Sequence, residues 1–333
     1  MPAPERMKRE IATPPLDPGH FELHRAALGE GIEIAYLREG IGGLPLVLVH
    51  GWPGSRRLWW RNIEPLAAAG FEVIVPDARG FGDSSVPEQP IAYPDIPASA
   101  ADIRALLASL GHQRCVLVGG DLGSGVAQHL ALEAPELVMR QVLFNGPSPH
   151  LPEAYELAGI PGNQFEEIGA LSDHMHVHGA EADALLDRLD TTAKRIEYVE
   201  GFFRGRSWVQ GEPIRRLAGA GGFDRASAAF LAAPFGDARV MRASLGYYEA
   251  GLNRELRSAK PRLAEINETT PTLILYGIED EIIGPNYPRR MEVALPNHVG
   301  PFLVGESGHF VQWERADVLN RAVASFCGDL LDA

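Results

Sequence analysis

The sequence predicts an α/β protein in which a mostly parallel, doubly wound sheet is interrupted by an inserted helical segment. Three observations predict this class. Short apolar runs alternate with helix-length segments over residues 45–144, the alternation stops near Pro147, and it resumes at residue 272. Alternating strand and helix segments are typical of a parallel sheet covered by helices on both faces. A chain of 333 residues is long enough for one large domain of this kind or for two domains of average size.

The elements before the parallel sheet are an arm and a hairpin. Five prolines precede His20, so the first twenty residues are expected to lie over the surface without a long helix. Residues 21–27 and 32–37 alternate apolar and polar side chains around Gly29 and Gly31, which predicts an antiparallel hairpin. The apolar run over 45–49 predicts the first strand that is buried on both faces.

The following hundred residues carry the alternating pattern. Helices are predicted over 58–69, 98–110 and 123–132, because their apolar residues have helical spacing and Gly70, Gly111 and Pro135 mark their ends. The apolar runs between them predict strands over 71–75, 114–118 and 138–144.

Residues 148–265 contain helix and loop patterns but no parallel-strand signal. Helices are predicted over 180–189, 193–203, 212–217, 226–233 and 238–257. A strand over 272–276, a helix over 287–295, a strand over 302–304 and a helix over 311–331 complete the sheet pattern. We therefore expect a core of residues 1–147 and 266–333, and a helical lid of residues 148–265 above the strand ends, where α/β sheets bind ligands.

Composition excludes several classes of partner. The formal net charge is −14, and a field of that sign repels phosphate backbones and anionic lipids, so neither nucleic acid nor a membrane surface is an expected partner. No apolar run approaches the roughly 20 residues that span a bilayer, and no signal peptide is recognisable. Cys115 and Cys327 both lie in apolar runs, which favours buried thiols in a reducing compartment and a cytoplasmic protein. A disulfide between the two is the alternative that the sequence leaves open.

The segment 118–125, Val-Gly-Gly-Asp-Leu-Gly-Ser-Gly, carries the strongest chemical signal. Asp121 lies between a predicted strand and a predicted helix, with Gly119 and Gly123 two residues away on either side. This is the pattern of a nucleophile elbow with aspartate in place of serine. Ser124 does not fit the pattern, because Leu122 and Val126 flank it at those distances. The alternative for Asp121 is a simple helix N-cap.

Three other segments favour the elbow over the cap. Trp52 lies in a turn after the strand ending at Val49, and its N–H and that of Leu122 would form an oxyanion hole. Asp280 follows the strand over 272–276, and His309 precedes the last helix. The order nucleophile, acid, histidine is the order used by the α/β-hydrolase fold.

These motifs give the sequence a resemblance to the α/β-hydrolase superfamily over nearly its whole length, and within it to the epoxide hydrolases, close to the dehalogenases. The matching segments are residues 50–55 (His-Gly-Trp-Pro-Gly-Ser), 77–84 (Asp-Ala-Arg-Gly-Phe-Gly-Asp-Ser), the Asp121 elbow, Tyr247-Tyr248, Gly277-x-x-Asp280 and Gly308-His309-Phe310. The sequence departs from the family at Gly120, where a histidine is usual, and at Leu122, where an aromatic residue or arginine is usual.

The resemblance implies Tyr248 as a lid residue that protonates the epoxide oxygen. The family's second lid donor is a tyrosine or, in some relatives, a histidine, and His176 is the better match by its distance before the helix over 193–203. The period-two spacing of His174, His176 and His178 leaves two other interpretations open, a metal-ligand set on a strand and a polar loop. No metal and no cofactor are expected.

The prediction is a cofactor-independent epoxide hydrolase that converts a small apolar epoxide to a vicinal diol. Asp121 would form an alkyl ester, which water activated by His309 would hydrolyse while Asp280 orients His309. One alternative is a haloalkane or haloacid dehalogenase with the same nucleophile. A non-catalytic binding protein of the same fold is a further alternative, and a homodimer is left open.

Overall fold

A computed structural model describes residues 11–160, 173–204, 208–209, 212–213 and 222–332. Its main element is an eight-stranded sheet in the order β1-β2-β4-β3-β5-β6-β9-β10. The strands are β1 Leu23–Gly29, β2 Ile32–Glu39, β3 Leu44–Val49, β4 Phe71–Pro76, β5 Cys115–Gly120, β6 Val138–Phe144, β9 Thr272–Gly277 and β10 His298–Val304. β2 pairs antiparallel with β1 and β4, and the remaining pairs are parallel. The predicted hairpin and mostly parallel sheet are therefore confirmed.

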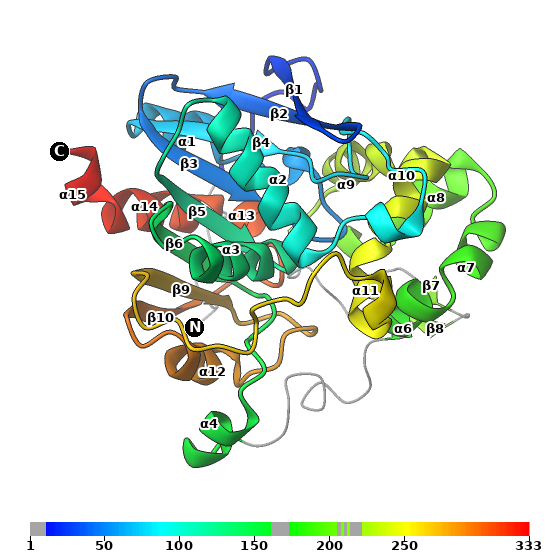
Figure 1. The fold of residues 1–333 in the computed structure, drawn as a ribbon. Coiled ribbons are helices and arrows are strands. Elements are labelled where there is room, and N and C mark those ends of the chain that lie inside the picture. The colour runs from blue at the N-terminus through cyan, green and yellow to red at the C-terminus, as the bar shows by residue number, and fades with distance from the viewer. Residues whose placement is uncertain (1–10, 161–172, 205–207, 210–211, 214–221, 333) are drawn as a thin grey trace, which may run out of the picture.

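Helices cover both faces of this sheet, as Figure 1 shows. α2 (Ile96–Ser109) and α3 (Leu122–Glu133) pack together in front of the strands, and α1 (Ile63–Ala68) contacts α14 (Ala316–Phe326) on the other face. α12 (Tyr287–Ala294) packs on β9 and β10. Every residue of β4, β5 and β9 is buried, which accounts for their largely apolar sequences. The charged exception is Glu72 in β4, which pairs with Arg38 and His112.

Two predicted helices of the core are divided. The segment predicted as a helix over 58–69 forms a 3-10 turn at Arg56–Trp59 and then α1, because Pro65 is tolerated only in the first turn of a helix. The segment over 311–331 forms α13 (Val311–Glu314), α14 and α15 (Gly328–Leu331). Arg315 separates α13 from α14 with a non-helical backbone, φ −133° and ψ 47°.

Most of the described helices between β6 and β9 lie together at one end of the sheet, at the right of Figure 1. We call residues 148–265 the inserted segment. Its described elements are α4 Pro152–Leu157, α6 Asp173–Ala180, α7 Ala182–Arg188, α8 Thr192–Arg204, β7 Trp208–Val209, β8 Glu212–Pro213, α9 Arg225–Ala232, α10 Ala238–Ser244 and α11 Gly246–Leu252, with 3-10 turns at Ala233–Gly236 and Arg254–Leu256.

Two helices predicted in the inserted segment are wrong in detail. At 212–213 the chain pairs antiparallel with 208–209 instead of starting a helix, and residues 214–217 lie outside the described residues. The helix predicted over 238–257 is split between α10 and α11. Ser244 Oγ donates to Met241 O at 2.8 Å, and back-bonding of this kind bends helices.

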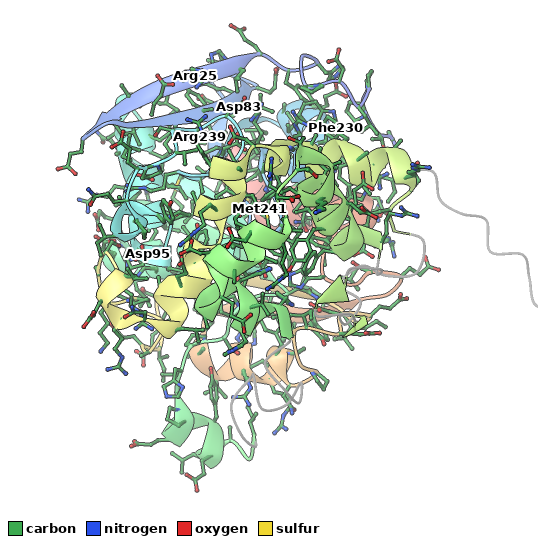
Figure 2. All side chains as sticks on the ribbon, turned by 90° about the vertical axis from the view of Figure 1, so that its right-hand side faces the viewer. Arg25, Asp83, Asp95, Phe230, Arg239 and Met241 are labelled. Carbon is green, nitrogen blue, oxygen red and sulfur yellow. The ribbon has the colours of Figure 1, made fainter. Side chains whose placement is uncertain are left out.

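Contacts with the turn after β3 hold the inserted segment over the strand ends. Arg57 Nη1 donates to Phe230 O at 2.9 Å, and the indole N–H of Trp52 donates to Ser244 Oγ at 3.2 Å. Figure 2 faces this side of the molecule and labels Phe230 and Met241 on the inserted segment. Both contacts lie beside the end of β3, where the sequence places one half of the predicted oxyanion hole.

Candidate active site

The turn between β5 and α3 holds Asp121 in a strained backbone conformation. Its φ is 52° and its ψ −136°, which is rare for a residue with a side chain. The flanking glycines are required by close packing: a Cβ on Gly119 would lie 2.4 Å from Gly123 O, and one on Gly123 would lie 2.2 Å from Val49 O. The result is a carboxylate raised at the end of β5, with 20% of its side chain exposed.

Three side chains from distant parts of the sequence meet at this carboxylate. Asp121 Oδ2 lies 3.0 Å from His309 Nε2, and His309 Nδ1 lies 2.7 Å from Asp280 Oδ2. Asp121 Oδ1 accepts the N–H of Trp52 at 2.8 Å. His309 and Asp280 are buried. The structure thus brings together the three predicted side chains in the order carboxylate, imidazole, carboxylate.

Asp280 is held by donors that fill its remaining acceptor positions. The N–H groups of Ile282 and Ile283 donate to Oδ1 at 2.8 and 3.1 Å, and Asn145 Nδ2 donates to Oδ2 at 2.7 Å. Asn145 in turn accepts the N–H of Gly277 at 2.8 Å. Asn145 follows β6 directly and was not singled out from the sequence, although a polar residue at a parallel strand end is a usable signal.

A second carboxylate fixes the loop that carries His309. Glu314, in α13, accepts the N–H of Gly308 at 3.1 Å and that of Phe310 at 3.0 Å. One side chain therefore holds the backbone on both sides of the histidine. The sequence offers no signal for Glu314, because its role depends on the fold of the loop back onto the helix.

The charges around His309 favour its protonated form. Burial lowers the pKa of His309, but the charge of Asp280 and the hydrogen bonds with Asp121 and Asp280 outweigh burial and raise that pKa to about 10. The imidazolium therefore balances part of the negative charge of the two carboxylates. Removal of the charge on Asp121 would remove part of this stabilisation.

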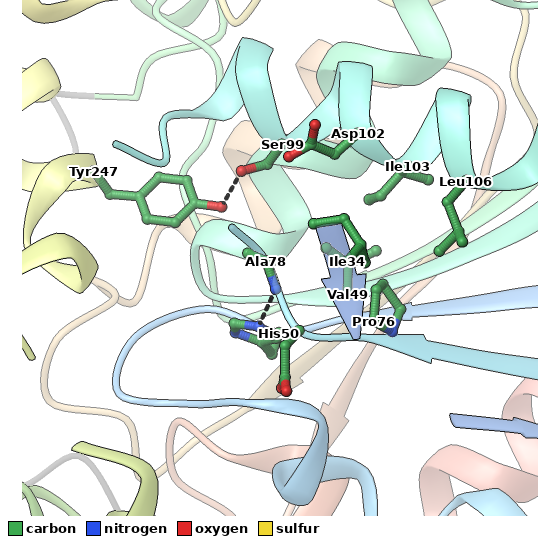
Figure 3. A pocket seen from close by; sticks show the side chains of 11 residues that line it. Ile34, Val49, His50, Pro76, Ala78, Ser99, Asp102, Ile103, Leu106 and Tyr247 are labelled. Carbon is green, nitrogen blue, oxygen red and sulfur yellow. Dashed lines mark hydrogen bonds between the residues drawn. The ribbon is translucent and has the colours of Figure 1, made fainter. Parts of the chain in front are cut away.

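The turn after β3 is fixed by His50. Its Nε2 accepts the N–H of Ala78 at 3.0 Å, as Figure 3 shows, and its Nδ1 lies 3.0 Å from Gly51 O. This pairing directs the next N–H, that of Trp52, to Asp121. Leu122 is the first residue of α3, so its N–H has no acceptor within the helix.

Residues 173–180 form helix α6, which corrects both the strand and the loop interpretations of the three histidines. On a helix, residues two apart lie on different faces, whereas residues four apart, such as His174 and His178, lie on the same face. His174 and His178 are accordingly buried. The side chain of His176 is 62% exposed and lies 3.9 Å from Glu181, so its placement does not fit a partner of Tyr248.

The buried histidines of α6 pack against Trp52 and Tyr248. The ring of His174 lies 6.1 Å from that of Trp52 and 6.0 Å from that of Tyr248. His178 lies 4.9 Å from Tyr248 by ring centroids, and its Nε2 is 2.8 Å from Tyr198 Oη. Nδ1 of His174 is buried without a hydrogen-bond partner among the described residues.

Electrostatics keep these groups in their neutral forms. Burial lowers the pKa of His174 to about 3 in spite of the nearby charge of Asp121. Burial and the charge of Asp121 raise the pKa of Tyr248 well above its usual range. A neutral imidazole and a protonated phenol therefore lie within range of the charge of Asp121, and both are hydrogen-bond donors.

The neighbouring tyrosine has a different environment. Tyr247 Oη lies 2.6 Å from Ser99 Oγ on α2, and its ring is buried beside the small cavity in Figure 3. The two adjacent tyrosines thus serve as a natural pair for comparison, one near Asp121 and one bonded to the core.

Packing explains the departure from the family pattern at Gly120, and hydrogen bonding explains the place of Ser124 in the elbow. A Cβ on Gly120 would lie 2.1 Å from the ring of Phe144, so that ring takes the space a larger side chain would need. Ser124 is fully buried, and its Oγ donates to Asp121 O at 2.9 Å. The serine is therefore a structural group of the elbow.

The described residues hold neither a cluster of metal-ligating side chains nor a membrane-spanning helix. No group of three or more histidine, cysteine, aspartate or glutamate residues there is arranged to hold a metal ion. No described helix combines the length and the apolar character needed to cross a bilayer.

Comparison with known proteins agrees with this geometry. A family model described as the alpha/beta hydrolase fold matches residues 45–168. The soluble epoxide hydrolase of Corynebacterium sp. (strain C12) is 36% identical over 162 residues, 48% of this chain and 52% of that protein, so the match spans about half of either length. A 2-hydroxy-6-oxononadienedioate/2-hydroxy-6-oxononatrienedioate hydrolase of Paraburkholderia xenovorans (strain LB400) is 26% identical over 321 residues, 92% of this chain and 91% of that protein.

The solved structure of the epoxide hydrolase CorEH superposes with a TM-score of 0.71 at 24% identity and covers 93% of this chain and 99% of that one. The chain has the α/β-hydrolase fold, as the sequence motifs predicted. Epoxide hydrolases are among the proteins to which the chain is similar, in agreement with the resemblance stated above.

Proposed function

We propose that the protein hydrolyses a small apolar epoxide to a vicinal diol through a covalent ester on Asp121. The observation that carries the proposal is the carboxylate at the elbow. One oxygen of Asp121 is held by the Trp52 N–H and the other by His309. A carboxylate suits displacement at a saturated carbon, because the attack forms an alkyl ester in one in-line step.

Ring opening needs a proton donor, and the inserted segment supplies the candidates. As a carboxylate oxygen of Asp121 bonds to the epoxide carbon, the C–O bond of the ring breaks and its electron pair goes to the epoxide oxygen. Tyr248 gives that oxygen a proton, and the neutral imidazole of His174 donates a second hydrogen bond in the role that the sequence assigned to His176. In this proposal residues 148–265 act as the lid.

Ester formation changes the charge around His309. An alkylated Asp121 is neutral, so the imidazolium loses one of the two carboxylates that raise its pKa. His309 then releases its proton, which restores the phenol of Tyr248 through solvent. The neutral imidazole takes a proton from water, and the hydroxide attacks the Asp121 carbonyl while Asp280 stabilises the imidazolium that forms. The N–H groups of Trp52 and Leu122 stabilise the tetrahedral intermediate, and its collapse releases the diol and the carboxylate.

The surroundings of Asp121 favour an epoxide over a halide. A departing halide needs N–H donors, and the indole N–H of Trp52 is already bonded to Ser244. Leu122 offers no side-chain donor next to the nucleophile. Ser124 is not placed to act as a serine nucleophile toward an acyl carbon, because it is buried and its hydroxyl donates to the elbow backbone.

The first experiment traps the ester. His309→Gln should still be alkylated at Asp121 but should not turn over. Intact-protein mass spectrometry after exposure to styrene oxide should show an adduct of the substrate mass, and Asp121→Asn serves as the matched control without an adduct. An unmodified His309→Gln protein that still binds the epoxide would contradict the ester mechanism.

The second experiment follows oxygen. A single turnover of wild-type protein in ¹⁸O-labelled water, with enzyme in excess, should give largely unlabelled diol and label in the peptide that contains Asp121. Fully labelled diol from the first turnover would show that Asp121 acts as a base for direct attack by water. A parallel incubation with a bromoalkane tests the alternative substrate class, since bromide release without diol formation from the epoxide would favour the dehalogenase.

A further inference from the structure

A cavity of about 270 Å³ opens where the inserted segment returns to the sheet. The starts of α2 and α3, one side of α11 and residues 257–264 form its wall. Two wall residues are chain neighbours of the candidate catalytic groups, because Leu122 follows Asp121 and Tyr247 precedes Tyr248. The volume is slightly below the usual range for ligand pockets, which indicates a small occupant.

Two cationic side chains lie in this wall with unused donors. Arg257 donates from Nε to Ala250 O at 2.5 Å and from Nη2 to Gly251 O at 2.9 Å. These bonds hold its guanidinium against the end of α11. Its Nη1 has no partner among the described residues. Lys260 makes no hydrogen bond or ion pair with any residue the structure describes. Its acidic neighbour Glu265 is already bonded to Arg262 at 2.7 Å.

The one acidic residue of the wall is saturated with donors. Asp95 accepts the N–H groups of Ala98 and Ser258, each at 2.7 Å, and the Ser258 hydroxyl at 2.7 and 2.9 Å. Figure 2 labels Asp95 beside the helices of the inserted segment. Because these donors occupy both of its oxygens, Asp95 has little capacity left to bind Arg257 or Lys260.

The remaining wall is largely apolar. Ile96, Leu122, Ala250 and Leu263 contribute aliphatic surface, and Tyr247 contributes its ring, since its hydroxyl is committed to Ser99. The same residue also lines the smaller cavity in Figure 3. The cavity therefore combines an apolar floor with two cationic groups at residues 257 and 260.

We propose that this cavity is a second binding site for a small amphipathic monocarboxylate, separate from the site at Asp121. The carboxylate binds Lys260 and the free Nη1 of Arg257, and the apolar body lies against Leu122 and Tyr247. With two cations and one anion in the wall, the local charge is positive in a chain whose net charge is −14. A single excess positive charge matches a monoanion.

The test measures binding of an unreactive probe, so it is independent of the proposed epoxide chemistry. Titration calorimetry at low salt compares 3-phenylpropionate with the neutral 3-phenylpropan-1-ol. We expect the carboxylate to bind about tenfold more tightly than the alcohol. Lys260→Gln should weaken carboxylate binding by about three- to fivefold, the scale of an exposed ion pair. Lys194→Gln is the matched control, because Lys194 lies on the inserted segment and pairs with Asp190.

A blocking variant locates the probe. Ala264 is an exposed wall residue, so Ala264→Trp should fill the cavity and weaken binding more than tenfold while the unfolding temperature stays close to that of the wild type. Lys260→Glu gives a second variant that needs no added volume and should abolish the preference for the carboxylate. Equal affinity for acid and alcohol in the wild type would overturn the proposal. Unchanged carboxylate binding in Ala264→Trp and Lys260→Glu would overturn it as well.

Discussion

Asp280→Asn should lower the pKa of His309 and uncouple the two chemical steps. The two buried side chains lie 2.7 Å apart, and the charge of Asp280 is the largest of the effects that raise the pKa of His309 to about 10. A hydrogen bond to a charged group contributes about 1.5–3 kcal/mol, and one pKa unit corresponds to ~1.4 kcal/mol. The variant should therefore show a His309 pKa about one to two units lower.

The kinetic consequence falls on ester hydrolysis. Loss of the acid that orients a triad histidine lowers turnover by about 10⁴-fold in a serine protease, and a loss of that order is expected here. Ester formation depends on Asp121 and the donors of the inserted segment, so a single equivalent of adduct should still form. NMR titration of the His309 ring, assigned by comparison with His309→Gln, gives the pKa, and rapid quench followed by mass spectrometry gives the two rates.

Asp329→Asn is the matched control, because Asp329 is an exposed aspartate whose partner is Arg140 and not a residue of the candidate site. It should change neither the pKa of His309 nor the rates. An Asp280→Asn protein with an unaltered His309 pKa and full turnover would refute the coupling of Asp280 to His309. A loss of ester formation equal to the loss of turnover would refute the separation of the two steps.

Two further predictions concern the inserted segment. Tyr248→Phe should slow ester formation by ~10²-fold in single-turnover assays, which is the scale of a lost general acid. Tyr247→Phe loses only its bond to Ser99 and should keep the rate of ester formation. Equal rates for wild type and Tyr248→Phe would exclude the donor role of Tyr248. His174 is held neutral with a pKa of about 3. As pH falls below 6.5, the unfolded state therefore takes up a proton at this residue that the folded state does not. At pH 5 this difference lowers the free energy of unfolding of the wild type by about 2 kcal/mol. His174→Gln should lose less stability than the wild type between pH 7.5 and 5 in urea unfolding, and identical losses would contradict the assignment.

Asp121, Asp280 and His309, which the structure brings into contact, share one property, which is a position fixed by a local pattern. Asp121 follows an apolar strand and is flanked by glycines that the close packing at the elbow requires. Asp280 and His309 follow the last two strands. In a parallel sheet the ends of such strands meet at one edge, so sequence order was enough to bring these side chains together.

The groups that the sequence missed depend on contacts between distant segments. Asn145 acts through Asp280, and Glu314 acts through the backbone around His309. The prediction of His176 as a lid donor does not take the helical period of α6 into account. The alternation of histidine with Met175 and Val177 imitates a strand, while the fold imposes a helix that turns the middle histidine to the solvent.

Glu314 has a consequence for how the protein is expected to lose activity. The His309 loop is held by a four-residue helix, α13, and Phe223 of the inserted segment stacks on the neighbouring Trp313 with ring centroids 5.6 Å apart. Local opening of a four-residue helix exposes less buried surface than global unfolding and so requires less free energy, and it would release the loop while the sheet stays intact. Heat inactivation would then precede the loss of β-sheet signal, and hydrogen exchange at Gly308 and Phe310 would report the fraction of molecules in which the histidine is in place.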